Sequence, residues 1–181
     1  MRYFTYETIA AANDWIEQTE SESKKAEEHF WKLVSQYEQE LETIKHRISK
    51  PAWNFFRYGF AETGLHDGRL LSFEIGDNMI YSPEESAFET KRGTRAKFQF
   101  LSQTEEFQQI FELRGVKSSR MNIIIDESLY QRNIGDLFTY ELTEVDDEYL
   151  QLGFIFAAGS EITVIFRKLI YKRSRQPKNG R

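Results

Sequence analysis

The chain has 181 residues, a formal net charge of −5 and no cysteine. A chain of this length fits one domain and buries about 70% of the surface exposed when it is unfolded, so neither a disulfide nor a structural metal is required. The lack of cysteine excludes a disulfide scaffold, a thiolate zinc site and a cysteine nucleophile. No signal peptide is visible, and no apolar run approaches the roughly 20 residues of a membrane helix, which predicts a cytoplasmic protein.

The charge is unevenly distributed along the sequence. Seven of the 24 basic residues and no acid follow position 166, so residues 1–166 hold 17 basic and 29 acidic residues, a net charge of −12. An acidic body repels nucleic acid, which leaves only the basic C-terminal end suited to contact it. The alternative role of that end is to neutralise the acidic body. We expect a protein partner with a basic surface.

Two helices are predicted in the first 50 residues. Residues 5–18 carry apolar side chains at helical spacings. A longer helix follows, with Ser21 or Ser23 as its N-cap and Pro51 as its end. Its apolar residues are spaced by 4, 3, 4, 3 and 4 positions and are Phe30, Val34, Tyr37, Leu41, Ile44 and Ile48. This seam predicts packing on the same domain, with a homodimer through the seam as the alternative.

Alternating apolar and polar residues predict strands in the second half. Hairpin turns are expected at 76–78 and 91–95. Three later runs, separated by short connections, predict an antiparallel meander and lie at 138–142, 150–156 and 162–166.

The region between these strands is less regular. Residues 104–113 fit a short helix, and 110–116 fit a strand equally well. Residues 121–125 are expected to form a buried strand, and 126–132 a helical turn or a loop.

These elements predict an α+β fold in which the long amphipathic helix packs on a mainly antiparallel β-sheet formed by the second half. We expect a single domain over 1–172, made of a helical front (1–50), an aromatic joint (51–69) and a β-rich part (70–172). A flexible basic tail is expected at 173–181. No linker rich in glycine, serine and proline separates the helical front from the β-rich part.

His66 and Asp67 are the candidate residues for catalysis. An adjacent His and Asp can ligate a metal or act as an acid/base pair. The other interpretation is that Asp67 and Gly68 turn the chain while His66 bonds to nearby backbone. The remaining histidines, His29 and His46, lack the spacing of a helical metal site. We favour the structural interpretation, with no metal site and no cofactor.

An aromatic segment with one arginine lies between the helical front and the β-rich part. Its candidate binding residues are Trp53, Phe56, Arg57 and Tyr58. Interleaved aromatic and arginine side chains anchor protein interfaces and also stack on bases. The alternative is that these rings belong to the core where helix meets sheet.

Four segments are distinctive: residues 1–5 (MRYFT), 65–73 (LHDGRLLSF), 137–142 (LFTYEL) and 154–162 (FIFAAGSEI). They resemble an uncharacterised family of Gram-positive bacterial proteins, and the resemblance implies no assigned activity. A His-Asp pair before a strand, followed by a β-rich half, is also similar to small toxin-immunity proteins.

We therefore expect a non-enzymatic protein-binding module, immunity-like, whose acidic body meets a basic partner. The alternative is a metal-assisted hydrolase centred on His66 and Asp67.

Overall fold

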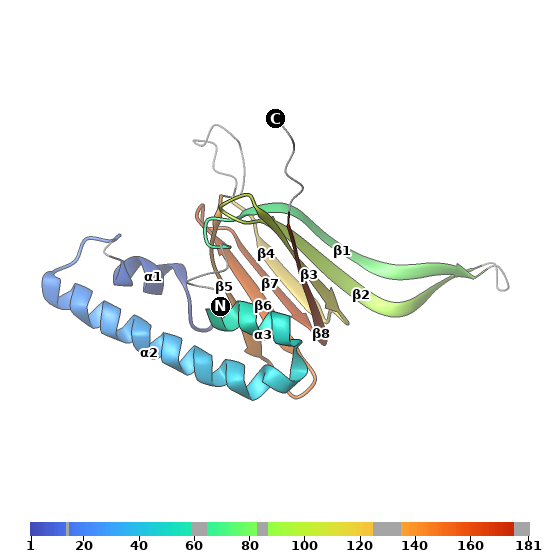
Figure 1. Ribbon diagram of the computed structural model, residues 1–181, viewed down its shortest axis with the longest axis horizontal. Helices are drawn as coiled ribbons and strands as arrows, with labels where there is room; N and C mark the ends of the chain where they lie inside the picture. Colours follow the sequence, from blue (N-terminus) through green and yellow to red (C-terminus); the bar gives the residue numbers. More distant parts are fainter. Residues whose placement is uncertain (14, 59–64, 83–86, 125–134, 176–181) are drawn as a thin grey trace.

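The computed structural model describes residues 1–13, 15–58, 65–82, 87–124 and 135–175 (Figure 1). The helices are α1 (Tyr6–Ala12), α2 (Glu20–Ile44) and α3 (Lys50–Tyr58), with a 3₁₀ turn, η1 (Lys45–Arg47), after α2. The strands are β1 (Arg69–Ser82), β2 (Ala87–Leu101), β3 (Phe107–Arg114), β4 (Ser118–Asn122), β5 (Leu137–Glu144), β6 (Leu150–Phe156), β7 (Glu161–Phe166) and β8 (Lys168–Arg175).

The predicted α+β fold is confirmed, with a long helix in the N-terminal half and antiparallel strands in the second half. The strands form two four-stranded sheets where the sequence predicted one. Sheet A has the order β1-β2-β3-β8, and sheet B has the order β4-β7-β6-β5. The predicted meander is confirmed as β5-β6-β7. β1 and β2 continue past the end of β3 as a two-stranded arm (Figure 1).

Aromatic side chains fill the space between the two sheets. Phe98 and Phe100 of sheet A are fully buried, and both rings meet that of Phe154 in sheet B, with centroids 4.9 and 5.0 Å apart. The main cover of each sheet is therefore the other sheet, whereas the sequence pattern predicted the long helix in this role. Alternation shows which residues face inward, but it does not show what they face.

Helix α3 closes one open side of the two-sheet stack. The ring of Phe55 lies 4.9 Å from Tyr171 in β8 and 5.0 Å from Tyr140 in β5, measured between centroids. These two strands are the outermost strands of sheets A and B. The neighbouring buried Phe56 also has ring contacts with both sheets, at Phe111 and Tyr140, so the buried aromatic residues of α3 join the two sheets.

Helix α2 protects the outer edge of β5. The hydroxyl of Tyr37 accepts a hydrogen bond from the Leu142 N–H at 3.0 Å, and the carboxylate of Glu40 accepts one from the Glu144 N–H at 2.8 Å. An edge strand otherwise presents unpaired N–H groups, which invite pairing with other chains. The apolar seam contributes Tyr37, Leu41 and Ile44 to the buried core.

The N-terminal segment is bound to the outer face of sheet B by Glu141. This carboxylate is fully buried and accepts hydrogen bonds from the backbone N–H groups of Arg2, Tyr3 and Phe4. Gly153 lies opposite Glu141 in the ladder, and a Cβ added there would lie 2.9 Å from Met1 Cγ. Glycine therefore leaves room for the segment to cross the sheet.

The helix ends differ from the predicted ones. Thr19 is the N-cap of α2, not Ser21 or Ser23, because its side chain and that of Glu22 form a reciprocal capping box. Pro51 does not end the long helix. α2 stops at Ile44, and Pro51 lies in the first turn of α3, where a missing N–H costs nothing. The first helix covers 6–12 rather than 5–18.

Two predicted turns are wrong. Residues 76–78 lie inside β1 at a register irregularity, and residues 91–95 lie inside β2. Glycine and aspartate there mark a bulge in a continuing strand rather than its end.

Of the regions left open, residues 107–114 form a strand, β3, rather than a helix. The buried strand predicted at 121–125 is wrong over its described part, 121–124, because β4 ends at Asn122 and is exposed along its length. Residues 173–175 belong to β8 and not to a tail. The prediction for 126–132 lies outside the described residues.

Replacing Glu141 by alanine should lower the free energy of unfolding by about 2–4 kcal/mol, since buried N–H groups lose a charged acceptor. Glu161→Ala is the control, because Glu161 is 41% exposed and meets the Met1 amino group at 3.2 Å. Its expected cost is below about 1 kcal/mol. Urea unfolding measures both, and equal losses would contradict the role of Glu141.

Tyr37 should make the fold sensitive to alkaline pH. Burial raises the pKa of its phenol well above the usual value, so the folded chain keeps a proton that the unfolded chain releases near pH 10. The stability that the buried Tyr37 contributes is therefore fully present below about pH 10 and is lost as the pH rises further. Tyr37→Phe should flatten this fall in urea unfolding, while Tyr6→Phe, on an exposed ring, should keep the parent slope. Parallel curves for Tyr37→Phe and the parent would contradict the assignment.

Candidate binding site

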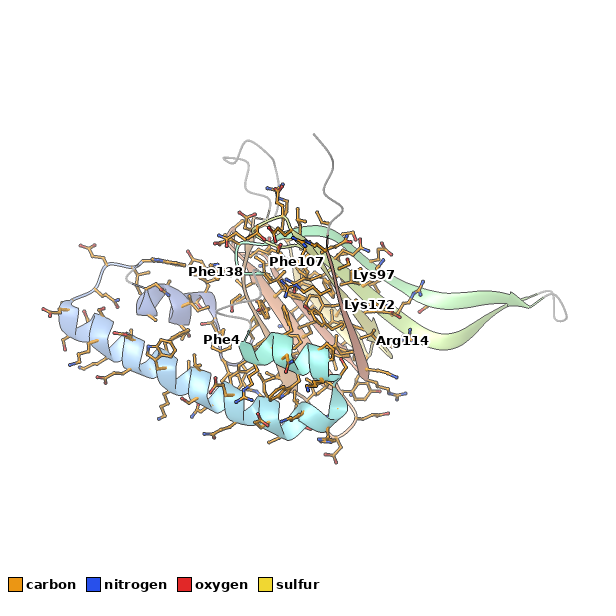
Figure 2. The ribbon with its side chains drawn as sticks, viewed as in Figure 1. Phe4, Lys97, Phe107, Arg114, Phe138 and Lys172 are labelled. Atoms are coloured by element: carbon orange, nitrogen blue, oxygen red, sulfur yellow. The ribbon has the colours of Figure 1, made fainter. Side chains whose placement is uncertain are left out.

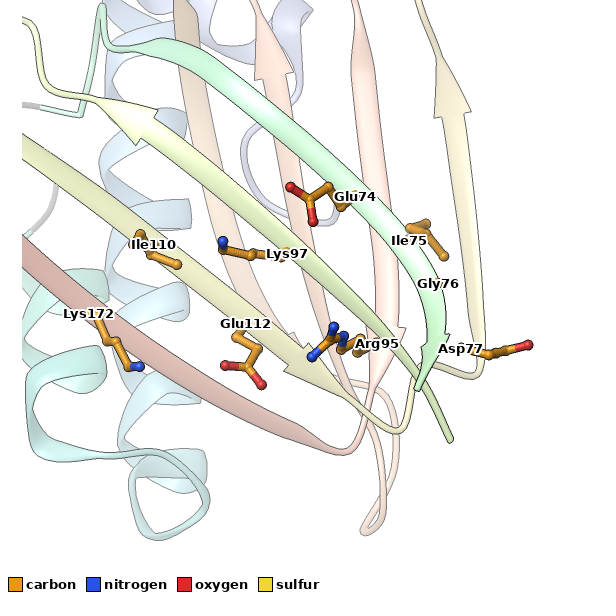
Figure 3. A pocket seen from close by; sticks show the side chains of 9 residues that line it. All are labelled: Glu74, Ile75, Gly76, Asp77, Arg95, Lys97, Ile110, Glu112 and Lys172. Carbon is orange, nitrogen blue, oxygen red and sulfur yellow. The ribbon is translucent and has the colours of Figure 1, made fainter. Parts of the chain in front are cut away.

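The outer face of sheet A contains a hollow of about 420 Å³ (Figure 3). We call it the sheet A hollow. It is lined by Glu74, Ile75, Gly76, Asp77, Arg95, Lys97, Ile110, Glu112 and Lys172. These residues come from all four strands of the sheet, so the hollow spans its full width.

Strand alternation places the charged residues on this face. Lys97 lies between Ala96 and Phe98, which are fully buried against sheet B, and Glu112 lies between the buried Phe111 and Leu113. Inward aromatic residues thus force their neighbours outward. The register then aligns Glu74, Lys97 and Glu112 in one row across β1, β2 and β3. In Figure 2, Lys97, Arg114 and Lys172 lie toward the arm and away from α1.

Two of the three carboxylates near the hollow are already satisfied. Glu112 accepts a hydrogen bond from Arg114 Nε at 2.7 Å, and this ion pair neutralises it. Asp77 accepts one from the Thr94 hydroxyl at 2.6 Å, and its carboxylate points away from the hollow (Figure 3). Glu74 is the remaining acid in the lining.

The cations of the hollow lack such partners. Arg95, Lys97 and Lys172 form no ion pair or hydrogen bond with any other side chain that the structure describes. Three cations thus face one uncompensated carboxylate, Glu74, on this surface. Guanidinium and ammonium groups without an ion-pair partner bind carboxylates, and arginine can bind both carboxylate oxygens at once. The partly buried Ile110 adds an apolar contact in the same hollow.

His66 and Asp67 lie in a tight turn before β1. His66 Nδ1 is 3.1 Å from Asp67 Oδ1, and each side chain is 50% exposed. Gln103 Nε2 donates to the other carboxylate oxygen at 3.2 Å, and Asp67 has a φ of 59°, a left-handed conformation that aspartate tolerates in turns. Across the described ranges, no group of three or more His, Asp or Glu side chains is placed to hold a metal. The hydrolase interpretation stays a prediction.

The aromatic candidates lie on α3. Phe56 is buried in the core at 1% exposure. Trp53 is 8% exposed, and its ring is covered by Lys45 Nζ at 4.1 Å and Arg57 Cζ at 4.8 Å from the centroid. Arg57 is partly exposed and meets Glu42 at 3.6 Å. The side chain of Tyr58 lies outside the described ones. The described rings thus pack inside the fold or at its rim, and their role in binding stays a prediction.

Sequence reasoning did not identify the cations of the sheet A hollow. Alternation with buried phenylalanine marks Lys97 as outward, but the sequence predicts a turn that includes Arg95. It predicts the end of the β-rich part at Lys172. No local signal joins these residues, because only the pairing of β2 with β3 and of β3 with β8 brings them together.

Comparisons with protein-family models, with curated proteins and with solved structures gave no match. The resemblance of the four short segments to a Gram-positive family therefore stays a prediction. In the described part of the chain, no helix is both long enough and apolar enough to cross a membrane.

His66→Ala should change the free energy of unfolding by less than about 0.5 kcal/mol, as expected for an exposed side chain. Neither the parent nor the variant should gain thermal stability from millimolar zinc or manganese. His46→Ala is the matched control, because His46 is exposed and bonds only to the Thr43 carbonyl oxygen among described residues. A metal-dependent rise in Tm that His66→Ala alone abolishes would favour the hydrolase.

Proposed function

We propose that the chain is a non-catalytic protein-binding module that binds an acidic segment of a partner protein in the sheet A hollow. The observation that carries the proposal is the convergence of Arg95, Lys97 and Lys172, without partners among the described side chains, on one open sheet face. The proposal places this interaction in the bacterial cytoplasm, for which the cysteine-free composition is suitable.

Charge supports both the attraction and its selectivity. The chain as a whole carries −5, so most of its surface repels an acidic partner. A local group of cations then offers the favourable contact, and repulsion elsewhere limits docking at other faces. The acidic body suggested a basic partner. The hollow favours an acidic partner instead, because its unpaired charges are mainly positive.

The shape of the hollow favours a segment of polypeptide. It is an open depression on a four-stranded face rather than an enclosed cleft around a reacting centre. Ile110 pairs with Lys172 and lies on the same face of β3 as Glu112, which suits a chain that presents acidic and apolar side chains. A long polyanion would extend beyond the hollow onto the acidic remainder of the surface. An immunity-like role is one setting in which such a module would act.

Removing two cations of the hollow should abolish partner capture. Lys97→Gln/Lys172→Gln would be compared with the parent and with Lys24→Gln/Lys32→Gln, which removes two exposed lysines of α2. Each tagged chain is cross-linked in its native host, and captured proteins are quantified by mass spectrometry. We expect a protein that the parent and the α2 control enrich at least about tenfold over the hollow variant, the loss expected from about 1.4 kcal/mol.

Glu74→Gln provides the opposite change. Since Glu74 is the uncompensated acid of the hollow, its neutralisation should increase capture of the same protein. Equal capture by the parent and the hollow variant, or weaker capture by Glu74→Gln, would contradict the proposal.

A further inference from the structure

The two open sides of the sheet stack differ in whether helices cover them. On one side, β5 and β8 are covered by α2 and α3. On the other side, β1 is the outermost strand of sheet A, and β2 is its only strand neighbour among the described residues. Long uncovered edges are uncommon, because they pair readily with other chains.

The direction of the β1 amides follows from one hydrogen bond. The carbonyl of Thr94 in β2 accepts from the Val116 N–H at 3.0 Å, on the β3 side of β2. The N–H and C=O of a strand residue point to the same side, and successive residues alternate. Asp77, which pairs with Thr94, therefore directs its N–H and C=O away from β2. The regular register from Ser72 to Asp77 places those of Ile75 and Phe73 on the same free edge.

The two faces of this edge have different chemistry. Ile75 shares its row with the fully buried Ala96 and Leu113, yet it is 40% exposed because no described strand lies beyond β1. On the outer face, Gly76 pairs with Arg95, and a Cβ added to Gly76 would meet nothing within 4 Å. A side chain from outside β1 can therefore pass over Gly76 and reach the guanidinium of Arg95.

We propose that the acidic partner segment adds as a strand to the free edge of β1, along Phe73 to Asp77. Its apolar side chains pack beside Ile75 on the inner face, and an acidic side chain passes over Gly76 to Arg95. Main-chain hydrogen bonds then supply affinity, and the alternating side chains supply specificity. This inference rests on the proposed function and specifies how the partner binds.

Backbone methylation of a peptide provides the test. The probe is a heptapeptide in which valine alternates with glutamate, titrated against the full chain by fluorescence anisotropy. Two derivatives carry N-methyl groups, one on the valine amides and one on the glutamate amides. Because strand residues alternate in direction, only one of these sets can face β1.

We expect one derivative to lose binding at least about tenfold, as for one lost hydrogen bond of about 1.4 kcal/mol, while the other keeps the parent affinity. Loss from the valine amides indicates antiparallel addition, and loss from the glutamate amides indicates parallel addition. Equal effects of the two derivatives overturn strand addition.

Substitutions at Ile75 test the same edge from the protein side. Ile75→Pro removes an N–H that we place on the free edge, where proline is tolerated, and Ile75→Thr keeps it. Binding should be lost in the proline variant alone, with equal Tm values for the two. If Ile75→Pro binds the peptide as well as Ile75→Thr, the inference fails.

The outcomes separate this inference from the proposed function. If the hollow variant still loses the natural partner but the peptide does not bind, or both derivatives bind alike, the function stands and strand addition falls. If sedimentation shows a dimer of the parent that Ile75→Pro dissociates and the peptide cannot displace, the edge belongs to a second copy, which also overturns the inference.

Discussion

Hydrogen bonding along β5, the outermost strand of sheet B that α2 covers, is the constraint on which the rest of the structure depends. A buried N–H without an acceptor costs free energy comparable to a lost hydrogen bond, so β5 cannot be covered by apolar side chains alone. Tyr37 and Glu40 supply acceptors for its outward N–H groups. On the face of the same strand, Glu141 supplies a carboxylate for the backbone of the N-terminal segment.

These contacts determine where the helical front lies, and so which surfaces stay open. Once α2 and α3 cover the side of the stack that contains β5 and β8, the outer face of sheet A and the edge of β1 remain exposed. The sheet A hollow lies on that face. The polar residues that attach the helices to sheet B thus indirectly leave the candidate binding surface free.

Local patterns predicted the elements whose signals are contained in a few residues. The meander of β5, β6 and β7 followed from alternation and short connections. The capping box of Thr19 and Glu22 is also a local signal. The predicted N-caps, Ser21 and Ser23, did not take it into account. The turns expected at 76–78 and 91–95 failed for another reason. At these positions, pairing between β1 and β2 is interrupted only by an irregularity between Asp77 and Met79 and resumes beyond it, and a ladder that long stabilises residues that would form a turn in isolation.

The sequence by itself determined the α+β class, the amphipathic long helix and the outward direction of residues such as Lys97, because these depend on periodicity along one segment. Only the tertiary structure decided that the strands divide into two facing sheets. It also decided that Arg95, Lys97 and Lys172 share a hollow and that β1 is left at an edge. These features depend on strand order and register, which are set by contacts between residues far apart in the chain.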